Sequence, residues 1–150
     1  MIVWLASYPR SGNTFLRVLM KSVFNLETYS IHGDQFDLAT EKSTREIVGH
    51  KPLTDDFCLQ TARNSDQLYL IKTHNLPTRD MKDDEVIYLI RDGRESIFSY
   101  LKYMNSFGTA NKVLSDIIYG NTPFGCWGEH VTAWAPQSRK KTLFIKFEDL

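Results

Sequence analysis

The chain has few cysteines, no apolar run long enough to cross a membrane, and no excess of either charge. Its two cysteines, Cys58 and Cys126, lack the C-x-x-C spacing of a metal site, and the four histidines lack zinc-type spacing. We therefore expect no metal. No apolar run approaches the roughly 20 residues of a membrane-spanning helix, and the first residues show no basic segment followed by a cleavable apolar one. These absences predict a cytoplasmic protein without a membrane span.

Charge is balanced over the whole chain. Lys+Arg and Asp+Glu both number 18, so the overall charge favours neither nucleic acid nor an acidic membrane surface as a partner. A composition of 42% hydrophobic and 24% charged residues is typical of a soluble globular protein, and 150 residues suit one domain. Any anion site must therefore be built locally by particular residues.

The opening stretch predicts an anion-binding turn. The apolar run over 2–6 is typical of a buried strand, and the next apolar residues recur at helical spacing. These residues are Leu16, Leu19, Met20 and Val23. A strand, a glycine-containing turn and a helix together leave unpaired backbone N–H groups at the helix start, where the helix dipole also favours an anion. Phosphate or sulfate is the expected guest beside Gly12.

The same turn resembles a Walker loop, G-x-x-x-x-G-K-[ST], without its lysine. Ser7 stands for the first glycine, Gly12 for the second, Asn13 for the lysine and Thr14 for the hydroxyl residue. Because an NTPase normally needs that lysine on the β- and γ-phosphates, Asn13 argues against ATP or GTP hydrolysis, and the cation of this loop is Arg10. The alternative is an ordinary strand-to-helix turn in which Gly12 only supplies a permissive backbone.

Two further apolar runs end in polar residues. The run over 68–71 predicts a strand that ends at Lys72 and His74, and the run over 85–90 predicts one that ends at Arg91. Ligands bind beyond the carboxyl ends of parallel strands, so these side chains would face the same crevice as Gly12. His74 is thereby a candidate general base; the alternative is a surface or capping histidine.

The segment after Arg91 predicts a helix. Asp92 and Glu95 have the spacing of a variant capping box. The apolar residues expected on its buried face are Ile97, Phe98, Leu101 and Met104. Arg91, at the crevice edge, and Ser99, about two turns into the helix, could reach one phosphate. The alternative is a salt bridge from Arg91 to Asp92 or Glu95, with Ser99 an ordinary polar residue.

The remaining segments predict elements without chemistry. They are a loop with at most one short helix over 25–45, a helix capped at Thr54 and running to 64, a loop with two helical turns over 105–121, a helix capped by Thr122 that stops before Pro136, and a strand over 143–147. The alternation of strands and helices predicts an α/β fold, with a P-loop-like, mainly parallel sheet flanked by helices in three layers, α/β/α.

Four segments resemble, in order, motifs of the sulfotransferases that use 3′-phosphoadenosine 5′-phosphosulfate (PAPS), in particular the cytosolic type. Y-P-R-S-G-N-T at 8–14 resembles their 5′-phosphosulfate loop, and K-T-H-x-x-P at 72–77 resembles the segment with the acceptor-activating histidine. I-R-D-G-R-E-S-I-F-S-Y at 90–100 resembles the segment whose arginine and serine hold the 3′-phosphate. G-C-W-G-E-H-V-T-A-W at 125–134 resembles the G-x-W-x-E-H-V segment, which adds no catalytic role.

The resemblance implies transfer of a sulfuryl group from PAPS to a hydroxyl or amine of a small acceptor, with 3′-phosphoadenosine 5′-phosphate (PAP) as the product nucleotide. His74 would take the acceptor proton, while Arg10 and Lys72 stabilise the developing charge. The nucleotide-binding residues that it implies are Arg10, Ser11, Gly12, Asn13 and Thr14 at the 5′-phosphate, Phe15 at the adenine, and Arg91 and Ser99 at the 3′-phosphate. Packing in the helix core is the alternative for Phe15.

The chain departs from the family pattern at two positions. Arg10 stands where cytosolic members usually have lysine, and Phe147 where many have tyrosine. The pattern also continues, after a segment like 147–150, into further helices and a basic loop that closes over the nucleotide. We therefore expect residues 1–150 to be a single sulfotransferase-like domain without the family's C-terminal part. The other hypotheses are a nucleotide-binding pseudoenzyme or fragment, and a P-loop small-molecule kinase, which Asn13 and the lack of a Walker-B acidic strand end disfavour.

Overall fold

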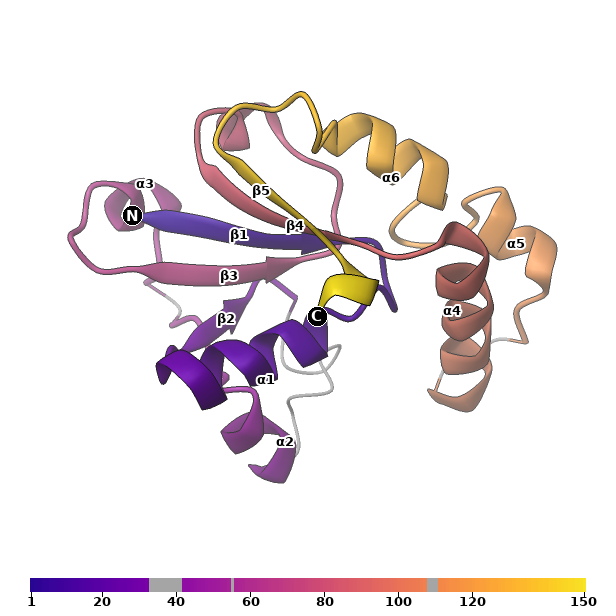
Figure 1. The fold of residues 1–150 in the computed structure, drawn as a ribbon, viewed down its shortest axis with the longest axis horizontal. Helices are drawn as coiled ribbons and strands as arrows, with labels where there is room; N and C mark the ends of the chain where they lie inside the picture. Colours follow the sequence, from indigo (N-terminus) through magenta and orange to yellow (C-terminus); the bar gives the residue numbers. More distant parts are fainter. Residues whose placement is uncertain (33–41, 55, 108–110) are drawn as a thin grey trace.

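A parallel sheet forms the centre of the fold (Figure 1). The computed structural model describes residues 1–32, 42–54, 56–107 and 111–150. Within these ranges the strands lie in the order β2-β3-β1-β4-β5, and each neighbouring pair is parallel. The strand bounds are β1 Ile2–Ser7, β2 Thr28–Ser30, β3 Tyr69–Thr73, β4 Glu85–Ile90 and β5 Thr142–Lys146. The predicted α/β class with a mainly parallel sheet is confirmed.

Strand β1 is paired on both edges, by β3 and β4, and apolar clusters bury both of its faces. Ile2, Trp4 and Ala6 belong to the apolar cluster on one face of the sheet. Val3 and Leu5 belong to the cluster on the other face. A strand that is covered on both faces needs apolar residues at every position, which explains the continuous apolar run at the start of the sequence.

Helices cover both faces of the sheet, and others pack beyond the carboxyl ends of its strands. The helix bounds are α1 Asn13–Phe24, α2 Lys42–Ile47, α3 Leu59–Arg63, α4 Gly93–Phe107, α5 Leu114–Ile118 and α6 Trp127–Trp134. Figure 1 shows α1 and α6 on opposite sides of the sheet, with α4 and α5 at the end of the central strands. The predicted three-layer arrangement is therefore present. None of the helices in the described ranges combines the length and apolar character that a membrane crossing requires.

The edge strand β2 was not predicted from the sequence, which indicated a loop with at most one short helix over 25–45. Its three residues, Thr28–Ser30, are too few for an apolar pattern, and they form a strand because they pair with β3. A short helix does follow, as α2, whereas residues 33–41 lie outside the described ranges.

Helix α3 begins later than predicted. The sequence indicates a cap at Thr54, but the helix spans Leu59–Arg63 and its N-cap residue is Cys58. Phe57 N instead donates to the carbonyl of Thr54 at 2.9 Å, so Thr54 precedes the helix and does not cap it. Asp55, part of the predicted cap, lies outside the described ranges.

Helix α6 also begins later, at Trp127 rather than after Thr122. The Sγ atom of its N-cap residue Cys126 accepts a hydrogen bond from Glu129 N at 3.4 Å. Thr122 Oγ1 donates to the carbonyl of Gly125 at 3.0 Å and so closes a turn. A threonine that can cap a helix can also close a turn, and local sequence does not distinguish the two uses.

Two side chains expected on buried helix faces are exposed. Phe98 is 54% exposed because its neighbour Ile97 already faces the core, and adjacent helical residues point in different directions. Val23 is 65% exposed in the last turn of α1. The contacts of this helix with the sheet are made nearer its start, by Leu16 and Met20.

Gly12 occupies a position that only glycine fits. Its φ of +98° lies in the left-handed region, and a Cβ atom there would lie 2.7 Å from Cε2 of Phe147, just after β5. Backbone strain and the clash with the Phe147 ring would therefore both disfavour a residue with a side chain at this position. The turn into α1 depends on this residue for its shape.

Gly12→Ala should lower the free energy of unfolding by about 1–3 kcal/mol, because alanine meets both the strained φ and the Phe147 ring. Urea denaturation followed by circular dichroism measures this change. Gly128→Ala is the matched control: it lies in α6, a Cβ there would meet no atom within 4 Å, and it should be neutral or stabilising by about 0.5–1 kcal/mol. Equal stabilities of the two variants would contradict the steric argument.

Candidate active site

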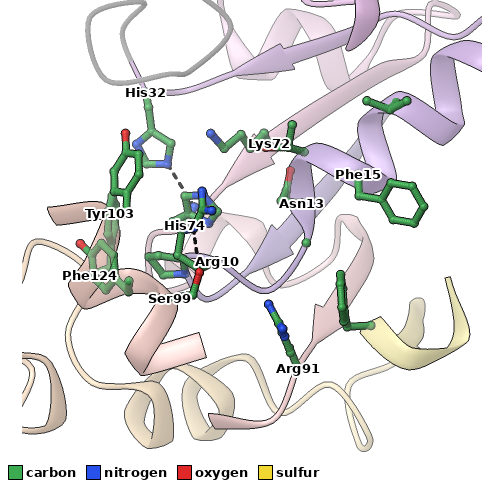
Figure 2. Close-up of a pocket in the computed structure, with 16 residues that line it drawn as sticks. Arg10, Asn13, Phe15, His32, Lys72, His74, Arg91, Ser99, Tyr103 and Phe124 are labelled. Atoms are coloured by element: carbon green, nitrogen blue, oxygen red, sulfur yellow. Dashed lines mark hydrogen bonds between the residues drawn. The ribbon is translucent and has the colours of Figure 1, made fainter. Parts of the chain in front are cut away.

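A cavity of about 470 Å³ lies beyond the carboxyl ends of the central strands (Figure 2). Of the predicted site residues, those on its wall are Arg10, Gly12, Asn13, Thr14, Phe15, Lys72, His74, Arg91 and Ser99. The wall residues that the sequence did not indicate as site residues are Pro9, Val18, His32, Tyr100, Tyr103, Phe124 and Phe147. Segments that are far apart in the chain therefore meet at one cavity, as the strand-end argument predicted.

Ser11 is the one predicted site residue that does not line this cavity. Its backbone N–H donates to the carbonyl of Tyr8 at 3.3 Å. Its hydroxyl lies 3.3 Å from the hydroxyl of Ser96, at the start of α4. Both polar groups are thus used inside the protein, and Ser11 fixes the loop to the neighbouring helix.

The start of α1 offers backbone donors to the cavity. Gly12 is the N-cap residue, no side chain caps it, and the first turn contains no acidic residue. The first helical hydrogen bond runs from Leu16 N to the carbonyl of Gly12, at 3.0 Å, so the preceding N–H groups of the turn have no partner within the helix. Together with the helix dipole, these groups suit an anion.

Asn13 fixes the helix start to β1. Its side chain is buried, and Nδ2 donates to the carbonyl of Leu5 at 2.9 Å and to Ser7 Oγ at 3.1 Å. The side chain therefore turns back toward the strand. It has neither the length nor the charge of the Walker lysine whose position it takes, in line with the argument against an NTPase.

Arg10 joins the loop to α4. Its Nε donates to Ser99 Oγ at 3.2 Å, and its guanidinium lies 5.2 Å from the centre of the Tyr103 ring (Figure 2). The backbone of Arg10 has a φ of 65°, an uncommon value for a residue with a side chain. Arg10, the cation of the loop, is therefore in direct contact with Ser99, the serine that the resemblance places at the 3′-phosphate.

Arg91 has both a cavity position and an ion pair. Its Nε and NH2 groups lie 2.9 and 2.8 Å from Glu95 Oε2, which is the pairing that the alternative interpretation indicated. Its guanidinium also lies 4.5 Å from the centre of the Phe147 ring. The Glu95 side chain is 58% exposed, so solvent weakens this pair and an incoming phosphate can compete for the guanidinium.

The cavity wall is electropositive. Arg10, Lys72 and Arg91 lie on it, and none of its described residues is acidic. Phe15 is 44% exposed, which excludes the alternative of packing in the helix core. Within the described ranges, no cluster of three or more histidine, cysteine or acidic residues could hold a metal ion. A large organic anion therefore fits this wall well.

His74 is held in one tautomer. Its Nδ1 lies 2.7 Å from the carbonyl oxygen of Ser7, and because a carbonyl only accepts, Nδ1 must carry the proton. Nε2 then keeps a lone pair. Burial lowers the pKa of His74 well below its usual value, and the nearby Lys72 ammonium lowers it further. A neutral imidazole with an available acceptor nitrogen is the form that a general base requires.

His32 is a second imidazole at the cavity. Its Nε2 accepts a hydrogen bond from the backbone N–H of His74 at 3.1 Å, and the two rings stack with centroids 5.6 Å apart (Figure 2). His32 follows β2, and it was missed because that strand was missed. Phe147 directly follows β5, and its position at the end of a predicted strand is the signal by which the sequence could have indicated it as a cavity residue.

A parallel α/β sheet whose strands end at a glycine turn and a cationic cavity defines the class of α/β proteins with an anion site at a helix start. Residues 2–150 match the family model described as the sulfotransferase domain, so the chain belongs to the sulfotransferase family. Mouse sulfotransferase 1B1 is 25% identical over 166 residues, which cover 97% of this chain and 52% of that protein. Human sulfotransferase 4A1 is 25% identical over 161 residues, which cover 99% of this chain and 54% of that protein. The chain spans about half the length of these curated relatives.

Solved structures of sulfotransferase type share the fold. Mouse sulfotransferase SULT7A1, complexed with PAP, superposes with a TM-score of 0.65 at 17% identity, over 99% of this chain and 52% of that one. Retinol dehydratase, in complex with androsterone and the inactive cofactor PAP, superposes with a TM-score of 0.65 at 18% identity, over 99% of this chain and 54% of that one. The P-loop-like α/β architecture is thereby established.

Buried histidines predict a stability that falls in acid. Burial lowers the pKa of His130 to about 4, so between about pH 6.5 and pH 4 the unfolded chain binds a proton that the folded chain does not. The free energy of unfolding should therefore decrease as the pH falls through this range, by up to about 3 kcal/mol from this group. His74 adds to the same trend.

Urea denaturation of wild type and His130→Gln at several pH values measures the contribution of His130. The glutamine does not titrate, so the difference in stability between the two proteins should shrink from pH 7.5 to pH 4.5. A difference that stays constant over this range would show that His130 is not held in its neutral form.

Proposed function

We propose that this protein binds PAPS in the cavity and transfers its sulfuryl group to a hydroxyl or amine of a small acceptor. The observation that carries the proposal is that the start of α1, Lys72 and His74 all lie on the electropositive wall of one cavity. The family match supports the reaction class. PAP in both solved neighbours supports the nucleotide, and androsterone in one of them supports a small-molecule acceptor.

In this proposal the two ends of the nucleotide have different partners. Backbone N–H groups at the start of α1 and the Thr14 hydroxyl hold the 5′-phosphate, with Phe15 beside the adenine. Arg91 and Ser99 hold the 3′-phosphate, which ordinary adenine nucleotides lack. Because Ser99 contacts Arg10, the two ends of the site are linked through one hydrogen bond.

The proposed reaction is an in-line displacement, for which bound PAPS supplies the activated sulfuryl group. His74 Nε2 takes the proton of the acceptor hydroxyl, and the oxygen thus activated forms the new bond to sulfur. The bond from sulfur to the bridging phosphate oxygen breaks, and PAP leaves. Arg10 and Lys72 stabilise the negative charge on that oxygen and on the transferred group.

Arg91→Ala should weaken PAP binding by about ten- to a hundredfold, because a charge-assisted hydrogen bond to the 3′-phosphate is lost, while AMP affinity changes little. Isothermal titration calorimetry measures both. Arg94→Ala is the matched control, because Arg94 is 89% exposed and pairs with Asp92. Equal losses for PAP and AMP would contradict the role of Arg91. In wild type, tighter binding of ATP with magnesium than of PAP would favour a kinase instead.

His74→Ala should lower turnover by about 10²- to 10⁴-fold, the usual contribution of a general base, and leave PAP affinity largely intact. The assay follows PAP release from PAPS with 4-nitrophenol as the probe acceptor. Asn75→Ala, a neighbouring exposed side chain, should keep wild-type turnover. A fully active His74→Ala variant would remove this histidine from the mechanism. PAP binding by a wild-type chain without transfer would indicate a nucleotide-binding protein only.

A further inference from the structure

The turn that carries His74 is held by side chains of helix α6. The carbonyl of His74 lies 3.1 Å from His130 Nε2, and the next carbonyl, that of Asn75, accepts a hydrogen bond from Trp134 Nε1 at 3.0 Å. Successive carbonyls after β3 are thus bound by residues one turn apart on the same helix. The helix supports the turn from the side of the sheet opposite α1.

The contacts of His130 determine its tautomer. A carbonyl only accepts, so Nε2 carries the proton that binds His74. His130 is fully buried and neutral at pH 7, which leaves a lone pair on Nδ1. That nitrogen lies 2.8 Å from the hydroxyl of Tyr88, which must donate to it. Burial raises the pKa of Tyr88, so the hydroxyl retains its proton.

The packing around His130 leaves its ring little freedom. The Tyr8 ring lies edge-on at 5.8 Å between centroids, and the Trp134 ring lies 6.3 Å away. Tyr88 belongs to strand β4, which pairs with β1 and β5, so the hydrogen-bonded series runs from the sheet, through His130, to the backbone of His74. A rigid support of this kind can fix the direction of an active-site side chain.

We propose that His130 is a positioning residue, which sets the orientation of His74 through its carbonyl, and that Tyr88 holds the His130 ring in place through its hydrogen bond to Nδ1. The proposal rests on the proposed function, in which His74 is the base. It gives a role to the E-H-V segment, which the sequence left without one. A displacement of about 1 Å at a reacting group can cost on the order of a hundredfold in rate, so the support matters for turnover.

Two amide variants separate positioning from packing. In His130→Gln the side-chain N–H falls near the place of Nε2 and can still donate to the His74 carbonyl. In His130→Asn the shorter amide falls near the place of Nδ1, so it can contact Tyr88 but does not reach that carbonyl. Both variants remove the ring and keep a polar amide, and they differ in which of the two hydrogen bonds of His130 they can keep.

For the transfer reaction we expect His130→Asn to lower kcat by about tenfold or more, with the KM for PAPS unchanged. His130→Gln should stay within about threefold of wild type, since it keeps the donor. The probe acceptor is 4-nitrophenol, and thermal unfolding checks that both variants fold. Equal kcat values for the two variants, or a wild-type kcat for His130→Asn, would overturn the proposal.

A second measurement does not depend on transfer. The ¹⁵N spectrum of the His74 imidazole should show one Nδ1–H tautomer in wild type and in His130→Gln, and averaged tautomer shifts in His130→Asn. An unchanged His74 signal in His130→Asn would overturn the positioning role. If wild type transfers no sulfuryl group, the proposed function fails, and this spectrum still decides whether His130 orients His74.

If His130→Asn does not unfold cooperatively, Tyr88→Phe replaces it. Phenylalanine keeps the packing on β4 but removes the hydroxyl that donates to His130 Nδ1 and holds the ring in place. We expect the His74 signal to broaden and kcat to fall several-fold. An unchanged His74 spectrum together with an unchanged kcat in this variant would overturn the proposal.

Discussion

The parallel pairing of β1 with β3 and β4 is the constraint on which the rest of the structure depends. Ala6 pairs with Thr73, and Ser7 pairs with Leu89, so the three strands end at the same level of the sheet. Parallel strands bring their carboxyl ends to one edge. The turn at Gly12, the turn at His74 and the start of α4 therefore meet there, and the cavity is the consequence of that meeting.

Burial at this edge then determines the chemistry. Desolvation favours the neutral form of an imidazole, and both His74 and His130 have lowered pKa values for that reason. Carbonyl oxygens of the backbone bind one nitrogen of each ring and so select one tautomer. The described cavity wall combines the neutral His74 ring with three cations and no acid, an environment that suits an anionic donor and a proton acceptor side by side.

Much of the fold could be predicted because strands β1 and β4 are continuous apolar runs, and such runs are a local signal. The candidate residues at the ends of these strands followed from the same signal. Strand β2 could not be predicted, since its three residues depend on pairing with β3, and His32 at its end was missed with it. The helix caps expected at Thr54 and Thr122 were wrong because both residues belong to turns instead, Thr54 through its backbone carbonyl and Thr122 through its side chain.

By itself the sequence determined the order of the helices and of strands β1, β3, β4 and β5, and the residue types at the strand ends, because periodicity and turn chemistry act over a few neighbouring residues. Only the tertiary structure decided which groups touch. Arg10 contacts Ser99 from 89 positions away, and His130 reaches the carbonyl of His74 from 56 positions away. Hydrogen bonds, tautomers and burial depend on distances in space, which form only when separate segments pack against one sheet.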